Sequence, residues 1–233
     1  MTALPGQSLA AVATVPAADN AAASLEPVSG RSPLSRVVHD CRAAVAGPAA
    51  VVVAVAEQLA DEVRAQLAGD GSDDIGLVVV TGAATRARCL AAALERAVAE
   101  PVSASHVLVY DVRQPLTPTE LRDRVVEHIR LGASAVLPVL PVTDSVKAID
   151  EHGVVTGSLD RSTLQTVQFP RGFAAEHLGR LIAGSVGEFD EAVEAIRSAV
   201  PVVTVDGDAE AVTVDLPHEG PLLEAVIAGR GAR

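Results

Sequence analysis

Short, valine-rich apolar runs recur along the chain and alternate with segments of helical periodicity. Each run has the length of one strand and contains few polar residues, as expected for parallel strands buried on both faces. Strands are predicted at residues 9–16, 50–56, 76–80, 106–110 and 134–139, and helices at 34–45, 57–68, 85–98 and 118–131. This alternation predicts right-handed βαβ units, a parallel sheet and the layout of a nucleotide-binding α/β fold.

The pattern changes after residue 138. Two apolar runs, 146–149 and 154–157, flank the turn sequence Asp-Glu-His-Gly, which predicts a hairpin leaving the main sheet as an arm. Helices at 173–183 and 188–199, a strand at 202–206 and a helix from about residue 219 complete the prediction. With Thr117 as N-cap and Pro118 at the first position, the helix at 118 has a clear start signal. Without repeats or a long linker, we expect a single domain over residues 1–233, with 1–8 disordered and about 140–168 forming the arm.

Composition narrows the kind of core and compartment. Apolar residues make up 49% of the 233 residues but aromatics only 2%, so the core must consist of Val, Leu, Ile and Ala. Cys41 and Cys89 lie far apart without CxxC spacing, which favours two buried thiols over a metal site or a disulfide. Since no apolar run is long enough to cross a bilayer and the N-terminus lacks signal-peptide features, we expect a cytoplasmic protein.

The formal net charge of −12 constrains the partners. It argues against nucleic acid and against an anionic membrane, and it disfavours a phosphorylated ligand unless local arginines offset the field. Lys147 is the sole lysine, and we expect it to be solvated or to face a dimer partner. The six histidines form no metal-binding pattern and are expected at the surface or at strand ends.

Four segments, in order, carry a family resemblance. They are TGAATR at 81–86, VLVYD at 107–111 with PLTP at 115–118, PVLPVTDSVK at 138–147, and LDRSTL at 159–164. Together they resemble the 2-C-methyl-D-erythritol 4-phosphate cytidylyltransferases, and the likeness extends from about residue 10 to 225. The resemblance implies a Rossmann-like nucleotidyltransferase fold of the nucleotide-diphospho-sugar transferase type, a three-layer sandwich. It also implies a β-arm that interlocks two subunits, so that each site borrows residues from its partner.

The family reaction joins CTP and 2-C-methyl-D-erythritol 4-phosphate, with Mg²⁺, in the non-mevalonate isoprenoid pathway. A phosphate oxygen attacks the α-phosphorus and pyrophosphate leaves, so positioning and charge neutralisation supply most of the catalysis. The resemblance assigns Asp111 to the metal, with a turn or capping role as the alternative. It assigns Thr81, Gly82 and Thr85 to base recognition, Cys89 to the place of a ribose-contacting serine, and Ser145 and Arg161 to the sugar phosphate, Arg161 from the partner subunit.

The cations that the family uses are missing at three places. The glycine-rich PAAGSGTR loop reads PAADNAAA at 16–23, so that both glycines are lost, Ala23 stands at the arginine position and Asp19 adds negative charge. No lysine follows before residue 33, and Arg31 fits a neighbouring turn better than the lysine position. In the segment resembling FKITTP, a C-terminal strand at 212–217, lysine has become Thr213 and a threonine has become Asp215.

Other positions are mixed. Gln114 replaces an arginine, Phe169 replaces a threonine of a TPQ-like motif, Arg113 is expected to face elsewhere, and Arg86 is expected to be a solvated or capping residue. Loss of one transition-state charge donor typically costs about 3–4 kcal/mol. We therefore favour a catalytically silent relative that binds a nucleotide weakly or regulates an active paralogue in a mixed dimer. The alternative is a divergent transferase that uses Arg31, Arg113 or Arg161.

Overall fold

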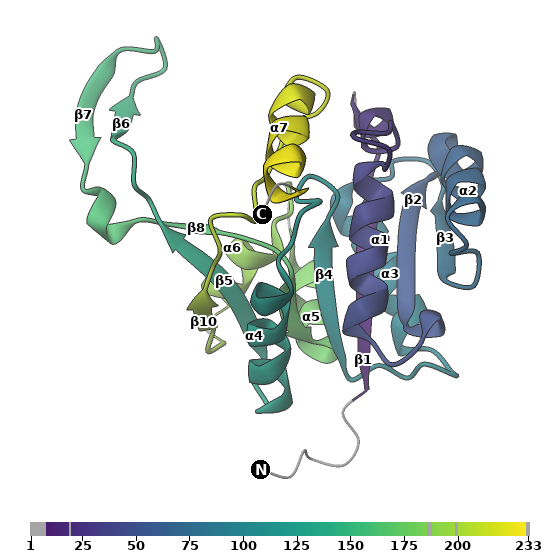
Figure 1. The fold of residues 1–233 in the computed structure, drawn as a ribbon. Helices are drawn as coiled ribbons and strands as arrows, with labels where there is room; N and C mark the ends of the chain where they lie inside the picture. The colour runs from purple at the N-terminus through teal and green to yellow at the C-terminus, as the bar shows by residue number, and fades with distance from the viewer. Residues whose placement is uncertain (1–7, 19, 186–187, 199, 232–233) are drawn as a thin grey trace.

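The computed structural model is built around a mixed sheet (Figure 1). Its strands follow the order β10 (Val203–Asp206), β5 (Ala135–Pro141), β9 (Arg171–Ala174), β4 (His106–Asp111), β1 (Leu9–Val15), β2 (Val51–Ala56) and β3 (Gly76–Val80), and β8 (Gln165–Val167) pairs with β5. The structure describes residues 8–18, 20–185, 188–198 and 200–231. The segment 1–7, most of the predicted disordered terminus, lies outside this part, whereas the Ser8 backbone is hydrogen-bonded to the Ser105 side chain.

Helices cover both faces of the sheet (Figure 1). One face is packed by α1 (Pro33–Ala44), α2 (Ala60–Gly69) and α4 (Thr119–Arg130), and the other by α3 (Arg86–Val98), α5 (Ala175–Gly184) and α6 (Glu191–Arg197). The last helix, α7 (Gly220–Gly231), contributes Leu223 to a smaller apolar cluster with Leu116 and Leu216. None of the described helices is long and apolar enough to cross a membrane.

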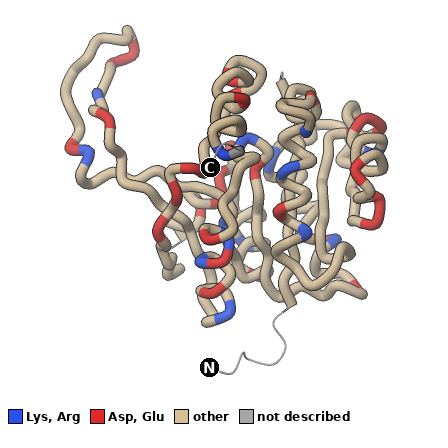
Figure 2. The backbone as a smooth tube through the Cα atoms, in the orientation of Figure 1, with Lys and Arg blue, Asp and Glu red and all other residues tan. Residues whose placement is uncertain are grey.

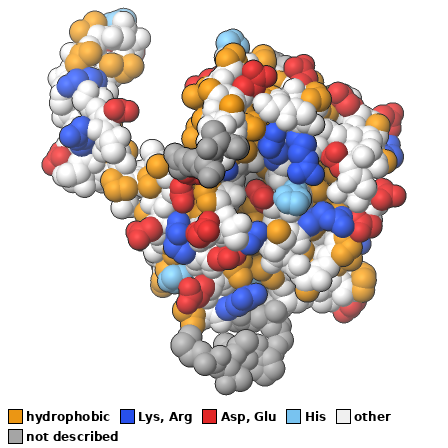
Figure 3. Space-filling model, viewed as in Figure 1, with side chains coloured by type: hydrophobic (Ala, Val, Ile, Leu, Met, Phe, Trp, Pro, Cys, Tyr) orange, Lys and Arg blue, Asp and Glu red, His pale blue; other side chains and the backbone are white. Residues whose placement is uncertain are grey.

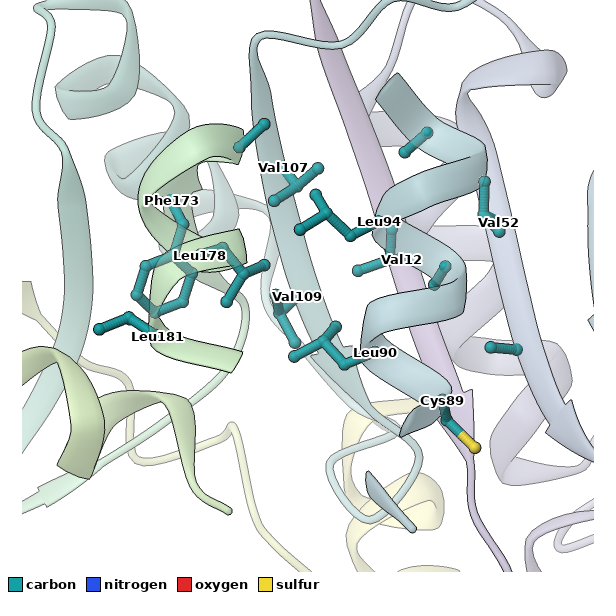
Figure 4. Packing of buried hydrophobic residues seen from close by; sticks show 14 of the residues in the cluster. Val12, Val52, Cys89, Leu90, Leu94, Val107, Val109, Phe173, Leu178 and Leu181 are labelled. Atoms are coloured by element: carbon teal, nitrogen blue, oxygen red, sulfur yellow. The ribbon is translucent and has the colours of Figure 1, made fainter. Parts of the chain in front are cut away.

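The strands alternate their side chains between two apolar clusters. In β1, Ala10 and Val12 face the α3 side, whereas Ala11 and Ala13 face the α1 side. Because both faces are covered, inward and outward positions are equally apolar, which explains the continuous runs in the sequence. Figure 4 shows the α3 side, where Leu90 and Leu94 lie over β1 and β4.

The main sheet is parallel, as predicted, except at β8 and β9. Strand β9 lies between β4 and β5 and is antiparallel to both, and Phe173, predicted to begin a helix, belongs to it. Gly172 permits this arrangement, because a Cβ there would lie 2.5 Å from Ile129 Cδ1 of α4. The sequence Arg-Gly-Phe-Ala lacks a strand pattern, so the local sequence favours the following helix instead.

Other expectations also need correction. Pro118 rather than Thr117 is the N-cap of α4, with no side-chain capping bond. The segment 212–217 is not a strand, although its Val214 N–H donates to the Arg113 carbonyl at 2.7 Å. His177 is buried in α5 rather than exposed, and this burial lowers its pKa.

The predicted hairpin is confirmed. Strands β6 (Val146–Ile149) and β7 (Val155–Leu159) form a separate two-stranded antiparallel sheet that projects from the body (Figure 1), and we call residues 146–159 the β-arm. Lys147 is exposed there and donates to Ser158 Oγ at 2.7 Å. Hydrophobic side chains cover part of the β-arm surface (Figure 3), including Ile149 at 64% exposed and Val155 at 60%.

Candidate functional site

A cavity of about 690 Å³ opens at the carboxyl ends of β1 and β4. The chain leaves β1 toward β2 on one side, whereas β4 lies on the other side, so this is the switch point at which parallel α/β sheets bind ligands. The walls come from the end of β1 and its following loop, the start of α3, the end of β4, Glu188 with Phe189, and Asp215 with Leu216. Of the residues predicted for the site, Asp111 and Thr85 are among those that line this cavity.

Asp111, the last residue of β4, is held between two guanidinium groups. Arg113 donates to Asp111 Oδ1 from its backbone N at 2.9 Å and from Nε at 3.1 Å. On Oδ2, Asp111 accepts from Arg113 Nη2 at 2.8 Å and from Arg86 Nη1 at 3.0 Å. Burial alone would raise the pKa of Asp111, but the hydrogen bonds from Arg113 and the charge of Arg86 outweigh it and lower the pKa. The prediction that Arg113 faces elsewhere is therefore wrong.

Arg86, at the start of α3, is clamped in turn by a second carboxylate. Its Nε and Nη2 donate to Glu191 Oε2 and Oε1 at 3.2 and 2.7 Å, and Glu191 is fully buried. Burial by itself would lower the pKa of Arg86, but Glu191 and Asp111 raise it, so the guanidinium stays protonated. The expectation of a solvated or capping Arg86 is wrong, because this side chain is the link between Asp111 and Glu191.

A second layer supports this pair. Arg171 is buried, donates to Asp190 Oδ2 at 2.9 Å and lies 3.5 Å from Glu191 Oε1. Its guanidinium lies 4.0 Å from the centre of the Phe169 ring, and that of Arg86 lies 5.4 Å from it, both within cation–π range. We call Arg86, Asp111, Arg113, Arg171, Asp190 and Glu191 the charge network. Sequence reasoning missed Arg171 and Glu191, because Glu191 lies 105 residues from Arg86 and no short motif joins them.

Gln114 lies behind the network, where the family resemblance places an arginine. It is buried, its Nε2 donates to the Phe169 carbonyl at 2.5 Å, and its Oε1 accepts from the Phe169 N–H at 3.1 Å. The side chain thereby pairs with both backbone groups of Phe169. An uncharged amide therefore positions the Phe169 ring, over which the guanidinium groups of Arg86 and Arg171 lie.

The loop after β1 uses its backbone groups internally. The N–H groups of Ala21 and Ala23 donate to Ala18 O at 3.2 Å and Asn20 O at 3.0 Å, within and before a 3-10 turn at Ala21–Ser24. Ala23 is 8% exposed and packs in the apolar cluster that contains Leu116 and Leu223. These donors are therefore not directed at a ligand, as a phosphate-binding loop requires. Asp19 lies outside the described residues.

The residues predicted for base and ribose contacts are only partly brought together. Thr85 lines the cavity as N-cap of α3, its Oγ1 accepting from Arg88 N at 3.3 Å. Thr81 and Gly82 are exposed in the turn between β3 and α3, where Gly82 has a φ of 70°. Cys89 is fully buried in the core (Figure 4), as predicted for a structural thiol, and burial raises its pKa to about 11.

The remaining predicted residues do not line the cavity of their own chain. Ser145 and Arg161 are exposed beside the β-arm, where Arg161 Nη1 donates to the Thr143 carbonyl. Thr213 is exposed next to the buried Val214, and Arg31 is exposed before α1. None of these four residues is among the described residues that line the cavity.

The residues at the cavity do not fit Mg²⁺. This ion requires oxygen ligands in near-octahedral geometry, often from one or two carboxylates. Both oxygens of Asp111 already accept hydrogen bonds from arginines, and so do both oxygens of Glu191. Within the described ranges, no group of three or more His, Cys, Asp or Glu residues could hold a metal.

Comparison with known proteins agrees with the fold and the motifs. A family model described as 2-C-methyl-D-erythritol 4-phosphate cytidylyltransferase matches residues 18–228. The protein of that name from Rhodococcus jostii (strain RHA1) is 40% identical over 178 residues, which cover 76% of this chain and 74% of the relative. The one from Saccharopolyspora erythraea is 38% identical over 210 residues, with coverages of 88% and 90%.

Solved structures give the same picture. The 2-C-methyl-D-erythritol 4-phosphate cytidylyltransferase from Thermus thermophilus aligns with a TM-score of 0.71 at 28% identity, covering 93% of this chain and 98% of that chain. The 4-diphosphocytidyl-2C-methyl-D-erythritol synthase from Anaerococcus prevotii has a TM-score of 0.76 at 18% identity, covers 96% and 99%, and supports the fold. The predicted Rossmann-like nucleotidyltransferase fold is confirmed, and the chain belongs to the 2-C-methyl-D-erythritol 4-phosphate cytidylyltransferase family.

Proposed function

We propose that this chain is a non-catalytic member of its family, which keeps the fold, the cavity and the β-arm and acts as the binding partner of another chain. The observation that carries the proposal is the charge network. The cavity arginines that could neutralise a triphosphate are bound to Asp111 and Glu191, and Asp111 is bound to those arginines. Nucleotidyl transfer needs such groups directed at the reacting phosphates.

The altered family positions support the same proposal. Ala23 packs into an apolar cluster, and Thr213 is a neutral residue beside the negatively charged Asp215. Each lost charge donor typically costs about 10²–10³ in rate. Even though such losses are not additive, three of them leave little of the family reaction.

The β-arm supplies the binding part of the proposal. Its exposed apolar side chains suit contact with a second chain, either another copy or an active relative. By the family resemblance, Arg161 would then contribute to the sugar-phosphate contacts of the partner's site. A divergent transferase remains the second candidate, favoured by one observation: the side chain of Arg113 is 61% exposed at the cavity.

The test is release of pyrophosphate from CTP, Mg²⁺ and 2-C-methyl-D-erythritol 4-phosphate by the purified protein. The relative from Rhodococcus jostii serves as the active control. We expect release at the rate of the enzyme-free background. Release well above background, abolished by an Arg113→Ala substitution, would overturn the proposal and favour the divergent transferase.

A further inference from the structure

We infer that the cavity takes an uncharged, hydroxyl-bearing ligand of nucleoside size in preference to the phosphorylated forms of the same molecule. The inference rests on the proposed function, since it concerns a cavity that binds without transferring phosphorus. It reverses the preference expected of a nucleotidyltransferase, in which most of the binding charge would serve the triphosphate.

The charged residues that line the cavity carry a net negative charge. Its described lining contains two cations, Arg86 and Arg113, and three anions, Asp111, Glu188 and Asp215. Both arginines are already paired with Asp111, and Arg86 is also paired with Glu191 directly behind it. The net charge that a ligand meets is therefore negative, so each added phosphate brings repulsion.

Asp215 contributes a carboxylate that is not neutralised by a neighbouring cation among the described residues. It is exposed at the cavity, and in the part of the chain that the structure describes its carboxylate makes no hydrogen bond or ion pair. Its backbone N–H donates to Glu219 Oε2 at 2.6 Å, which places a second carboxylate nearby. An anionic ligand in this cavity would face a carboxylate that no arginine neutralises.

The cavity also has uncharged groups that can form hydrogen bonds with a ligand. Thr14 lines the cavity, is 1% exposed, and its Oγ1 has no hydrogen-bond partner among the described residues. Asn20 uses its Nδ2 to bind the Leu216 carbonyl at 3.0 Å, and its amide oxygen can still accept. A buried hydroxyl without a partner costs about 1–3 kcal/mol, which a ligand hydroxyl or carbonyl would recover.

The walls of the cavity are largely apolar. Val15, Pro16, Val112, Phe189 and Leu216 give the cavity apolar surfaces. A volume of about 690 Å³ lies in the range of small-molecule sites. Such walls accept a planar base or a sugar ring but leave a phosphate without compensating charge.

Calorimetric titration with cytidine, CMP and CTP at constant ionic strength, with and without Mg²⁺, tests the inference. We expect saturable cytidine binding at millimolar concentration or below, and affinity that falls by about tenfold from cytidine to CTP. CTP binding as tight as cytidine, or no saturable cytidine binding, would overturn the inference. Either of these two outcomes without pyrophosphate release would overturn the inference and leave the proposed function intact. Pyrophosphate release would overturn the proposed function.

Matched variants assign the preference to the cavity. Asp215→Asn should reduce the ratio of cytidine to CTP affinity by about threefold. Asp73→Asn changes the net charge equally but lies in the exposed turn before β3, at the opposite edge of the sheet, and should leave the ratio unchanged. Equal effects of both variants would contradict a local origin.

A third variant tests the neutral contacts. Thr14→Val keeps the shape of the side chain but removes the hydroxyl, and should weaken cytidine binding by about threefold or more. Unchanged cytidine affinity with an unchanged fold would contradict the assignment of the hydroxyl to the ligand.

Discussion

The cavity and the β-arm differ in which groups they leave without a partner. At the cavity, Asp111 and Glu191 are buried, and Arg86 is half-buried and pairs with both. On the β-arm, β6 and β7 pair with each other, while the side chains of Ile149 and Val155 project into solvent. The chain has 30 acidic and 18 basic residues in all, and Figure 2 shows residues of both signs on the β-arm.

The difference indicates where this chain keeps its capacity to interact. A group that meets a ligand or partner is often incompletely satisfied within its own chain, because the other molecule completes it. Arg86, Asp111 and Glu191 are paired with one another without a ligand, whereas the apolar side chains of Ile149 and Val155 on the β-arm are exposed. We therefore expect the network to govern stability and the β-arm to govern association.

The largest effect should come from the centre of the network. Glu191→Ala leaves the buried Arg171 and the half-buried Arg86 without their shared carboxylate, and should lower the free energy of unfolding by about 3–5 kcal/mol. Urea unfolding measures this change. The control Glu176→Gln removes only an exposed pair with Arg180 and should change it by less than about 0.5 kcal/mol. Similar values for the two variants would show that Glu191 contributes no more to stability than an exposed ion pair does.

The next effect concerns the β-arm. Ile149→Asp together with Val155→Asp should weaken association by at least about tenfold, because each apolar side chain is worth about 1.5–3 kcal/mol when buried. Sedimentation across a concentration series measures the dissociation constant. The unfolding free energy of the monomer should not change, since both side chains are exposed. Unaltered association would show that Ile149 and Val155 of the β-arm do not contribute to contact between chains.

A smaller effect should appear as a function of pH. The folded-state pKa of Asp111 is lowered from an ordinary value near 3.8, so its stabilising contribution is present above that value and is lost as the pH falls toward the folded-state pKa. The stability difference between the native chain and Asp111→Asn should therefore shrink as the pH is lowered from 6 to 3. A difference that stays constant would mean that folding does not lower the pKa of Asp111.

The smallest effect is expected from restoring a single cation. Thr213→Lys is an exposed change and should tighten CTP binding by about threefold without pyrophosphate release. Calorimetry and the pyrophosphate assay measure the two quantities. Turnover restored by this one lysine would show that the network does not prevent catalysis.

The sequence predicted most of the sheet, because strands buried on both faces carry unbroken valine runs such as β2. It did not predict β9, whose Arg171 and Gly172 are placed by tertiary packing against α4 and the network. The position of Asp111 followed from the end of β4. The pairing of Arg86 with Glu191 could not be predicted, since it depends on how α6 returns to the sheet after a long intervening sequence.

The most direct test of the account is a crystal structure of the protein soaked with CTP and Mg²⁺. We predict that Arg86 remains bound to Asp111 and Glu191, with no ordered triphosphate and no metal at Asp111. A structure in which Arg86 or Arg113 has left Asp111 to hold the β- or γ-phosphate, with a metal on that carboxylate, would contradict it.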